Sequence, residues 1–267
     1  MIPKKIHFCW LSGDEYPPLI KHCIETWHKV LPDYEIVLWD TKRFDIDSVQ
    51  WVKEAFEARK YAFAADYIRL YAVFTEGGIY LDSDVEVLKP FDDLLKFKAF
   101  IGFEAATQSI EAAIFGAEAG CEWCARAMEF YNDRHFVVDD RGGVDLSITA
   151  PNVVRQALNR AYGNFPTQPP KTQLLLQHSG MEMLVCPAEY FSPIKYDMEK
   201  SYTTQNSIAK SYRQNPKTYC IHRFNASWGV KPPLKLQLWD MIKKRCERIL
   251  GERVFNMAIN QLRRFMR

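Results

Sequence analysis

Residues 71–91, YAVFTEGGIYLDSDVEVLKPF, place two aspartates one residue apart, just after a Gly-Gly break and a short apolar run. In a β-strand, residues i and i+2 point to the same side, so we expect Asp82, Asp84 and Glu86 on one face. Three carboxylates at that spacing repel one another unless a positive group lies between them. The sequence therefore predicts a positively charged partner close to the aspartate pair.

The composition is that of an ordinary globular protein. The chain has 267 residues, of which 48% are hydrophobic and 25% charged, enough to bury a full core. A net charge of +2 argues against extensive nucleic-acid binding. The opening MIPKKIHFCW lacks the apolar segment of a secretory leader, and no apolar run reaches about 18 residues. Together with seven scattered cysteines, these features favour a reducing, cytoplasmic location.

Strand and helix patterns alternate along the chain. We expect strands at 5–10, 34–40, 98–104 and 112–118, besides the strand that carries the aspartates, and helices at 19–32, 48–58 and 61–75. Gly77 and Gly78 are expected to end the last of these helices. This alternation predicts an α/β sheet with helices packed on it. Ligands of such sheets bind outside the carboxyl ends of strands, where Trp10 and the aspartate pair fall.

An Asp-x-Asp pair alone is common in turns, but here a stiff, buried strand presents it. Carboxylates held rigidly at a sheet edge suit Mg²⁺ or Mn²⁺ that also contacts phosphates. A calcium loop of the EF-hand type starting at Asp82 would need Gly at position 87 and Glu at position 93, and the chain has neither. An aspartyl-phosphate phosphatase, with Asp82 as nucleophile and Asp84 as acid, remains an alternative.

Three blocks of sequence, in order along the chain, resemble glycosyltransferase family 32, the DXD-containing sugar transferases. They are IPKKIHFCWLSG at 2–13, AADYIRLYAVFTEGGIYLDSDVEVLKP at 64–90 and YCIHRFNASW at 219–228. The glucosylating clostridial toxins have a similar core. The resemblance implies a GT-A-like nucleotide-sugar-binding fold with a mixed central sheet.

The resemblance also implies roles for single residues. Asp82 and Asp84 match the DXD pair that contacts the metal and the donor ribose. Asp66 and Arg69 match a pair that holds the hydroxyls and phosphate of the donor sugar, although they also fit a simple i, i+3 ion pair on a helix surface. Trp10 matches an aromatic that stacks on the nucleotide base, although a tryptophan at a strand end can equally belong to the core.

The closing block supplies two further candidates. His222 is expected to be a third metal ligand or a donor to the diphosphate, unless it is a core histidine, and Trp228 is expected to bind the donor. Two stretches depart from the family pattern. Thr149-Ala150-Pro151 stands where the family has Thr-Gly-Pro, and SIEAAIFGA at 109–117 does not clearly match a polar residue that the family often shows there.

These features predict a metal-dependent glycosyltransferase, and the family resemblance implies retention at the anomeric carbon. It would use Mn²⁺ or Mg²⁺ and a nucleotide-diphosphate sugar, with a UDP-sugar favoured over GDP-mannose because the chain resembles bacterial capsule enzymes. The acceptor would be a hydroxyl of a glycan or lipid-linked glycan in surface polysaccharide synthesis. The sequence offers no clear nucleophile for double displacement, which favours a front-face mechanism. A phosphatase and a non-catalytic sugar-binding module remain alternatives.

The chain changes character after residue 230. Residues 231–267 contain ten Lys or Arg and three Asp or Glu, so this segment is near +7. Apolar residues recur there every three or four positions, which predicts a basic amphipathic helical tail after a catalytic domain at 1–230. The tail could pack on the body, form a dimer contact or dock on an anionic membrane, which would place the enzyme peripherally on the inner face of the cytoplasmic membrane.

A C-x-x-C pair, Cys121 and Cys124, could be a metal or redox site, but no second pair accompanies it. We expect two buried helix thiols.

Overall fold

The computed structural model describes residues 1–138, 143–145, 147–194 and 211–224. These described residues all belong to one unit of the chain. The predicted tail at 231–267 and the predicted donor contact Trp228 lie outside the described residues, so the domain boundary at 230 stays a prediction. Among the described helices, none has the length and apolar character needed to cross a bilayer.

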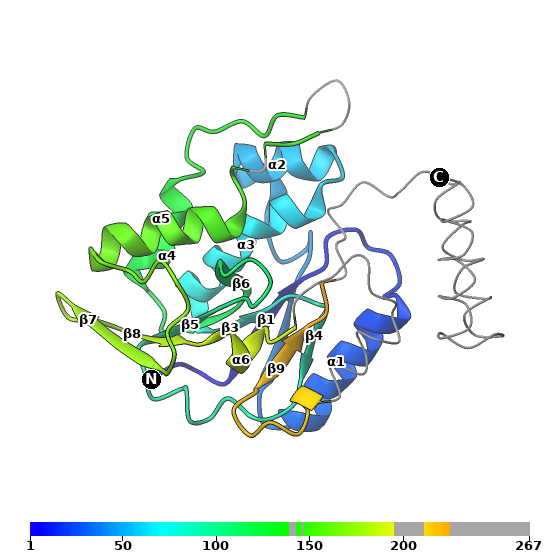
Figure 1. Ribbon diagram of the computed structural model, residues 1–267. Coiled ribbons are helices and arrows are strands. Elements are labelled where there is room, and N and C mark those ends of the chain that lie inside the picture. Colours follow the sequence, from blue (N-terminus) through cyan, green and yellow to red (C-terminus); the bar gives the residue numbers. More distant parts are fainter. Residues whose placement is uncertain (139–142, 146, 195–210, 225–267) are drawn as a thin grey trace, which may run out of the picture. The chain divides into compact units, whose positions relative to one another are not determined.

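The described part of the chain is built on a seven-stranded mixed sheet with the order β2-β1-β3-β6-β5-β8-β7 (Figure 1). Its strands are β1 (Lys5–Cys9), β2 (Glu35–Trp39), β3 (Gly78–Leu81), β5 (Ala99–Phe103), β6 (Ile110–Ala117), β7 (Leu174–His178) and β8 (Met181–Cys186). The pairs β1–β2, β1–β3 and β5–β8 are parallel, whereas β6 runs antiparallel to both β3 and β5. The predicted α/β fold with a mixed central sheet is confirmed.

A small antiparallel sheet accompanies the large one. It consists of β4 (Val85–Val87) and β9 (Cys220–His222), which are far apart in sequence. Its formation brings the closing block of the chain next to the segment that follows β3.

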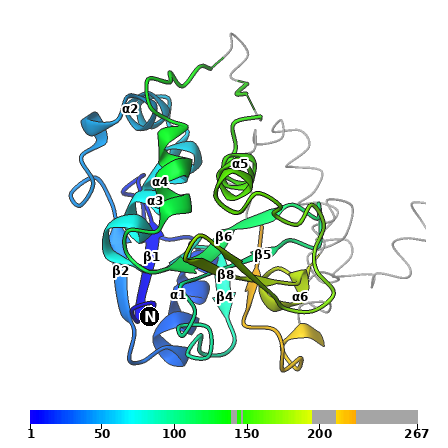
Figure 2. The same cartoon turned by 90° about the vertical axis from the view of Figure 1, so that its left-hand side faces the viewer.

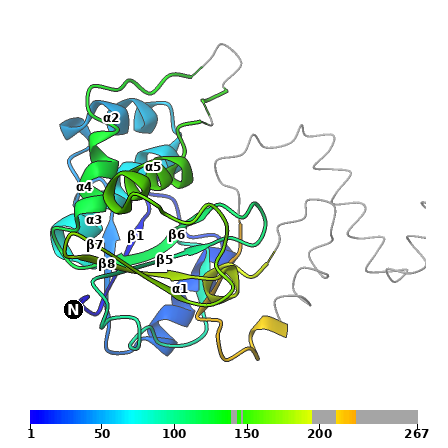
Figure 3. The ribbon, with the colours of Figure 1, turned by 60° about the vertical axis from the view of Figure 1, so that its left-hand side comes forward.

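Helices cover both faces of the large sheet (Figures 2 and 3). They are α1 (Pro18–Val30), α2 (Gln50–Glu57), α3 (Tyr61–Glu76), α4 (Glu122–Glu129), α5 (Ala150–Tyr162) and α6 (Ala188–Phe191), with a short 3₁₀ turn at Ile46–Ser48. Helices α2 to α5 enclose one apolar core, and α1 and the small sheet enclose the other. Cys121 stands at the N-cap position of α4 and is half-buried, whereas Cys124 is buried within the helix, both as free thiols. The expectation of two buried helix thiols therefore holds only for Cys124.

Helix α1 fixes the small sheet. Proline at its first position is compatible with a helix start because no intrahelical bond is lost there. Its buried Trp27 donates the indole N–H to the carbonyl oxygen of Val85 at 2.7 Å. One residue earlier, Thr26 accepts a hydrogen bond from the backbone N–H of Val87 at 2.9 Å. Strand β4 is therefore held from the helix side as well as by β9.

Two glycines carry the chain from α3 into β3, as the sequence predicts. Gly77 and Gly78 have φ angles of +64° and +116°, which side-chain-bearing residues rarely adopt. A Cβ at Gly78 would lie 2.9 Å from the carbonyl oxygen of Lys5 and 3.0 Å from Nε2 of His7. Only glycine lets β3 begin directly beside β1.

His7 ties this glycine turn to the sheet. Its side chain is fully buried on β1. Its Nε2 lies 2.8 Å from the carbonyl oxygen of Gly77, and its Nδ1 lies 3.0 Å from the indole nitrogen of Trp39, which can only donate. The neutral ring with hydrogen on Nε2 satisfies both contacts. Burial lowers the pKa of His7 below its ordinary 6.5.

We therefore expect His7 to make the fold sensitive to mild acid. Above pH 6.5 the ring is neutral in both the folded and the unfolded chain. Below it the unfolded chain takes up a proton that the folded chain resists, so the free energy of unfolding falls by up to about 1.4 kcal/mol per pH unit. Of the nearby charges, Glu76 opposes the lowered pKa, whereas Lys5 and Arg43 reinforce it.

His7→Gln should be less stable than wild type at pH 7.5, and the difference in the free energy of unfolding should become smaller between pH 6.5 and 5.5. Urea unfolding of both proteins across this pH range measures that difference. Carboxylates that titrate in both proteins cancel in the difference, so parallel pH profiles would contradict the assignment.

Candidate active site

The aspartate pair lies in a turn between two sheets. Strand β3 ends one residue before Asp82, and β4 begins one residue after Asp84. The backbone N–H of Val85 donates to the carbonyl oxygen of Asp82 at 3.0 Å, which closes the turn. The prediction of one continuous strand with Asp82, Asp84 and Glu86 on a single face is therefore wrong. The chain leaves the large sheet here and enters the small one.

Glu86 has its own cations on the small sheet. It is 4% exposed, and its carboxylate accepts two hydrogen bonds from Arg213, at 2.9 and 3.0 Å. Arg223 lies 3.6 Å from the same carboxylate. These contacts balance the buried charge of Glu86 and attach the segment 211–224 to β4.

Arg69 is the positive partner of Asp82. It is 5% exposed and reaches from the middle of α3, where its two terminal nitrogens lie 2.9 Å from Asp66 and 3.3 Å from Asp82. It also donates to the carbonyl oxygen of Ala112 on β6 at 3.0 Å. Its guanidinium lies 4.8 Å from the centre of the Tyr80 ring. The alternative of an isolated ion pair on a helix surface is wrong, because the pair is buried and shared.

Asp66 receives a second contact from the start of α5. It is 8% exposed, and its Oδ2 accepts the backbone N–H of Ala150 at 3.1 Å. Burial raises the pKa of Asp66 to about 6, although Arg69 and the Ala150 amide oppose the shift. The stretch that departs from the family's Thr-Gly-Pro thus contacts one of the predicted donor-binding residues through its backbone.

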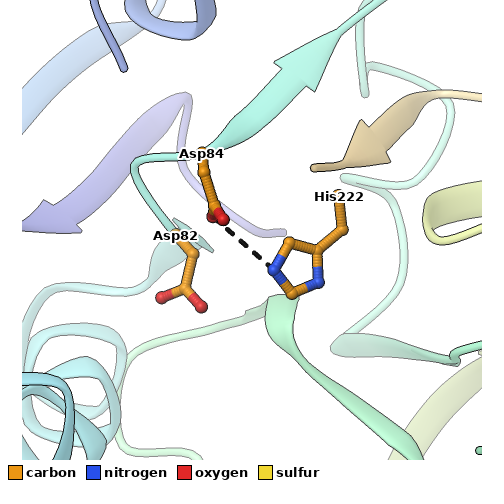
Figure 4. A group of neighbouring side chains, drawn as sticks. All are labelled: Asp82, Asp84 and His222. Carbon is orange, nitrogen blue, oxygen red and sulfur yellow. Dashed lines mark ion pairs between the residues drawn. The ribbon is translucent and has the colours of Figure 1, made fainter. Parts of the chain in front are cut away.

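His222 is the positive partner of Asp84. Its Nε2 lies 3.5 Å from Oδ1 of Asp84 (Figure 4). On the other edge of the ring, its Nδ1 lies 3.3 Å from Oε1 of Glu111. Burial alone would lower the pKa of His222, but Glu111 and Asp84 outweigh it and raise the pKa to about 10. The imidazole is therefore a cation held between two carboxylates in this arrangement.

Asp82, Asp84 and His222 also fit a divalent cation. Each offers one ligand atom, and these atoms all lie within 4.8 Å of one another (Figure 4). Carboxylate oxygens are the ligands of Mg²⁺ and Mn²⁺, and imidazole joins them at many transition-metal sites. The two carboxylates suit Mn²⁺ or Mg²⁺, and the imidazole favours the transition metal Mn²⁺ over Mg²⁺. The role of each residue stays a prediction.

Sequence analysis missed Glu111. This glutamate lies on β6, a strand whose eight residues are all buried, and it is 2% exposed. Only its position in the apolar stretch SIEAAIFGA could have identified it, since an ionised carboxylate is rarely buried there without a partner. That partner is His222, which lies more than a hundred residues away in the sequence.

Trp10 lies directly after β1, at the predicted sheet edge, and is half-buried. Its indole N–H donates to the carbonyl oxygen of Asp14 at 2.7 Å, and its ring meets Tyr16 edge to face at 5.0 Å. The ring also packs partly against the core on the α1 side. Its role in stacking on a base stays a prediction.

Arg69 is expected to be the most sensitive charged residue of this network. Arg69→Met leaves the buried Asp66 and the half-buried Asp82 without their cation, and breaking a buried ion pair in this way typically costs about 3–5 kcal/mol. Arg126→Met, which breaks the exposed Glu122–Arg126 pair on α4, should cost less than about 1 kcal/mol. Urea denaturation compares the two variants, and equal losses would contradict the network.

A family model described as "Glycosyltransferase sugar-binding region containing DXD motif" matches residues 17–101. This segment contains Asp66, Arg69, Asp82 and Asp84, but neither Trp10 nor His222.

Two of the curated relatives, both from fungi, illustrate the similarity. Glucan organizing enzyme 1 of Cryptococcus neoformans var. grubii is 46% identical over 56 residues, which are 21% of this chain and 15% of that protein. Inositol phosphoceramide mannosyltransferase 3 of Schizosaccharomyces pombe is 32% identical over 107 residues, which are 38% of this chain and 29% of that protein. The matched segments span less than a third of either relative.

A solved glycosyltransferase involved in glycosylation of the major capsid of PBCV-1 is 12% identical, with a TM-score of 0.46. The match covers 82% of this chain and 94% of that glycosyltransferase. The family match over residues 17–101 agrees with the resemblance found in the sequence: this segment is similar to the sugar-binding region of DXD-containing glycosyltransferases.

Proposed function

We propose that this protein transfers a sugar from a nucleotide-diphosphate donor to a hydroxyl of a glycan or lipid-linked glycan, with retention at the anomeric carbon. One observation carries the proposal. The Asp66–Arg69–Asp82 network lies inside the segment that matches the DXD family, and through Asp82 it adjoins the Asp82–Asp84–His222 group, whose histidine comes from β9 outside that segment. A binding site for sugar hydroxyls and one for a cation with diphosphate would thus be neighbours.

Each residue has a proposed task. Asp82, Asp84 and His222 would hold Mn²⁺ or Mg²⁺, which when bound supplies positive charge for the departing diphosphate. Asp66 would accept hydrogen bonds from hydroxyls of the donor sugar. Arg69 keeps Asp66 and Asp82 in place, and its positive charge favours the phosphate groups of the donor.

The contacts of the carboxylates support a front-face mechanism. Double displacement needs a carboxylate free to attack the anomeric carbon. Arg69 engages Asp66 and Asp82, and Glu111 lies buried beneath His222. We therefore propose that the leaving phosphate takes the proton of the acceptor hydroxyl.

The donor and the cellular role are finer proposals. The sequence favours a UDP-sugar, whereas the S. pombe relative is named a mannosyltransferase. GDP-mannose is therefore the donor to compare with UDP-sugars. Surface polysaccharide synthesis, a cytoplasmic location and peripheral membrane binding rest on the sequence alone.

Asp84→Asn tests the proposed function. It keeps the size of the side chain and removes its charge, so metal-dependent donor hydrolysis and transfer should both fall at least about 100-fold, with the fold retained by circular dichroism. Mass spectrometry of the products separates the alternatives. A phosphatase releases inorganic phosphate, and a non-catalytic module leaves the donor intact. A variant that transfers sugar at the wild-type rate would contradict the proposal.

Trp10→Ala tests base stacking. If the ring stacks on the base, affinity for UDP should fall by about 1–3 kcal/mol while the melting temperature changes little. Tyr16→Ala is the matched control, because it removes the aromatic neighbour of Trp10 and leaves its indole in place. Normal UDP affinity in a destabilised Trp10→Ala protein would assign Trp10 to the core.

A further inference from the structure

We propose that Glu111 is a positioning residue that orients His222 toward the cation. The inference rests on the proposed function, because it concerns how one ligand of that site is prepared. In this arrangement Glu111 holds Nδ1 of the imidazole and leaves Nε2 directed toward the aspartate pair.

The first support is the placement of Glu111. An ionised carboxylate inside a sheet is costly unless it is paired and hydrogen-bonded. Glu111 accepts the backbone N–H of Ala113 at 3.0 Å, and its two oxygens lie 3.3 and 3.4 Å from Nδ1 of His222. An ionised carboxylate has no hydrogen to donate, so Glu111 can only accept hydrogen bonds from the imidazole and from the Ala113 amide.

The second support is the geometry of the ring. The two nitrogens of an imidazole lie on different edges, and an acceptor at one edge fixes a hydrogen there. With Nδ1–H donating to Glu111, Nε2 is the nitrogen that can bind a cation, and it lies on the side of Asp84. Phe224 stacks on the ring at 4.0 Å between centroids, which restricts rotation of the imidazole.

The third support is the origin of the contacting elements. Glu111 belongs to the large sheet, whereas His222 belongs to the small sheet that also begins beside Asp84. A carboxylate behind a metal-binding histidine commonly fixes its tautomer and raises its basicity, and its loss typically weakens metal binding 10- to 100-fold. Glu111 is placed to do this for His222.

Glu111 could instead serve only as an anchor between the two sheets. The matched control for an anchor is Asp93→Asn. Asp93 accepts a hydrogen bond from the hydroxyl of Tyr219 at 2.5 Å. Since Tyr219 lies three residues before His222, this bond anchors the same segment from a residue other than the histidine. A purely structural role predicts that loss of Asp93 and loss of Glu111 affect metal binding alike.

The experiment measures Mn²⁺ binding to the full chain by calorimetry, without any sugar donor. We expect Glu111→Gln to bind Mn²⁺ about 10- to 100-fold more weakly than wild type, and Asp93→Asn to bind it normally. Wild-type affinity in a folded Glu111→Gln protein, or equal losses in both variants, would overturn the inference.

A second measurement needs no substitution at Glu111. In ¹⁵N-histidine-labelled wild type saturated with Zn²⁺, a diamagnetic cation that binds imidazole, long-range ¹H–¹⁵N spectra should show His222 protonated at Nδ1 alone, with the signal assigned by its loss in His222→Asn. Protonation at Nε2 would overturn the inference.

Asp84→Asn separates the inference about Glu111 from the proposed function. If Asp84→Asn abolishes Mn²⁺ binding while Glu111→Gln does not weaken it, only the inference fails. No Mn²⁺ binding by wild type contradicts both.

Discussion

The site depends on one buried guanidinium. Moving a charged side chain out of water is costly, and Arg69 offsets the cost by facing Asp66 and Asp82 at once and by donating to a backbone carbonyl of β6. Helix α3, the turn after β3 and strand β6 must therefore keep one arrangement. Arg69 and His222 together offset the repulsion between the two aspartates. Arg69 on α3 lies close to Asp82, and His222 on β9 lies close to Asp84.

Local patterns predicted much of this arrangement. The glycine pair, the helix before it and the apolar strand after it follow from backbone preferences, which depend on neighbouring residues alone. The continuous strand through Asp84 was wrong because alternation of side chains cannot reveal where a chain changes sheets. That change depends on β9, whose pairing with β4 joins distant residues.

The candidate site shows the same division between local and distant information. Asp82 and Asp84 lie only one residue apart in the sequence, and a family resemblance identifies Asp66, Arg69 and His222. Glu111 is identified neither by a nearby acidic residue nor by the family resemblance. Its role comes from a contact with a histidine on another sheet, and a single glutamate in an apolar strand is weak evidence by itself. Buried charges are informative once their partners are known, because each must be balanced by a specific neighbour.

The central claim is that the turn after β3 and the end of β9 together form a cation site for a nucleotide diphosphate. A crystal structure of the full chain soaked with Mn²⁺ and UDP tests it most directly, through the anomalous signal of manganese. The account predicts one strong peak bound by Asp84 and His222, with the diphosphate on its open side. A manganese peak away from these residues, or UDP bound elsewhere on the chain, would contradict it.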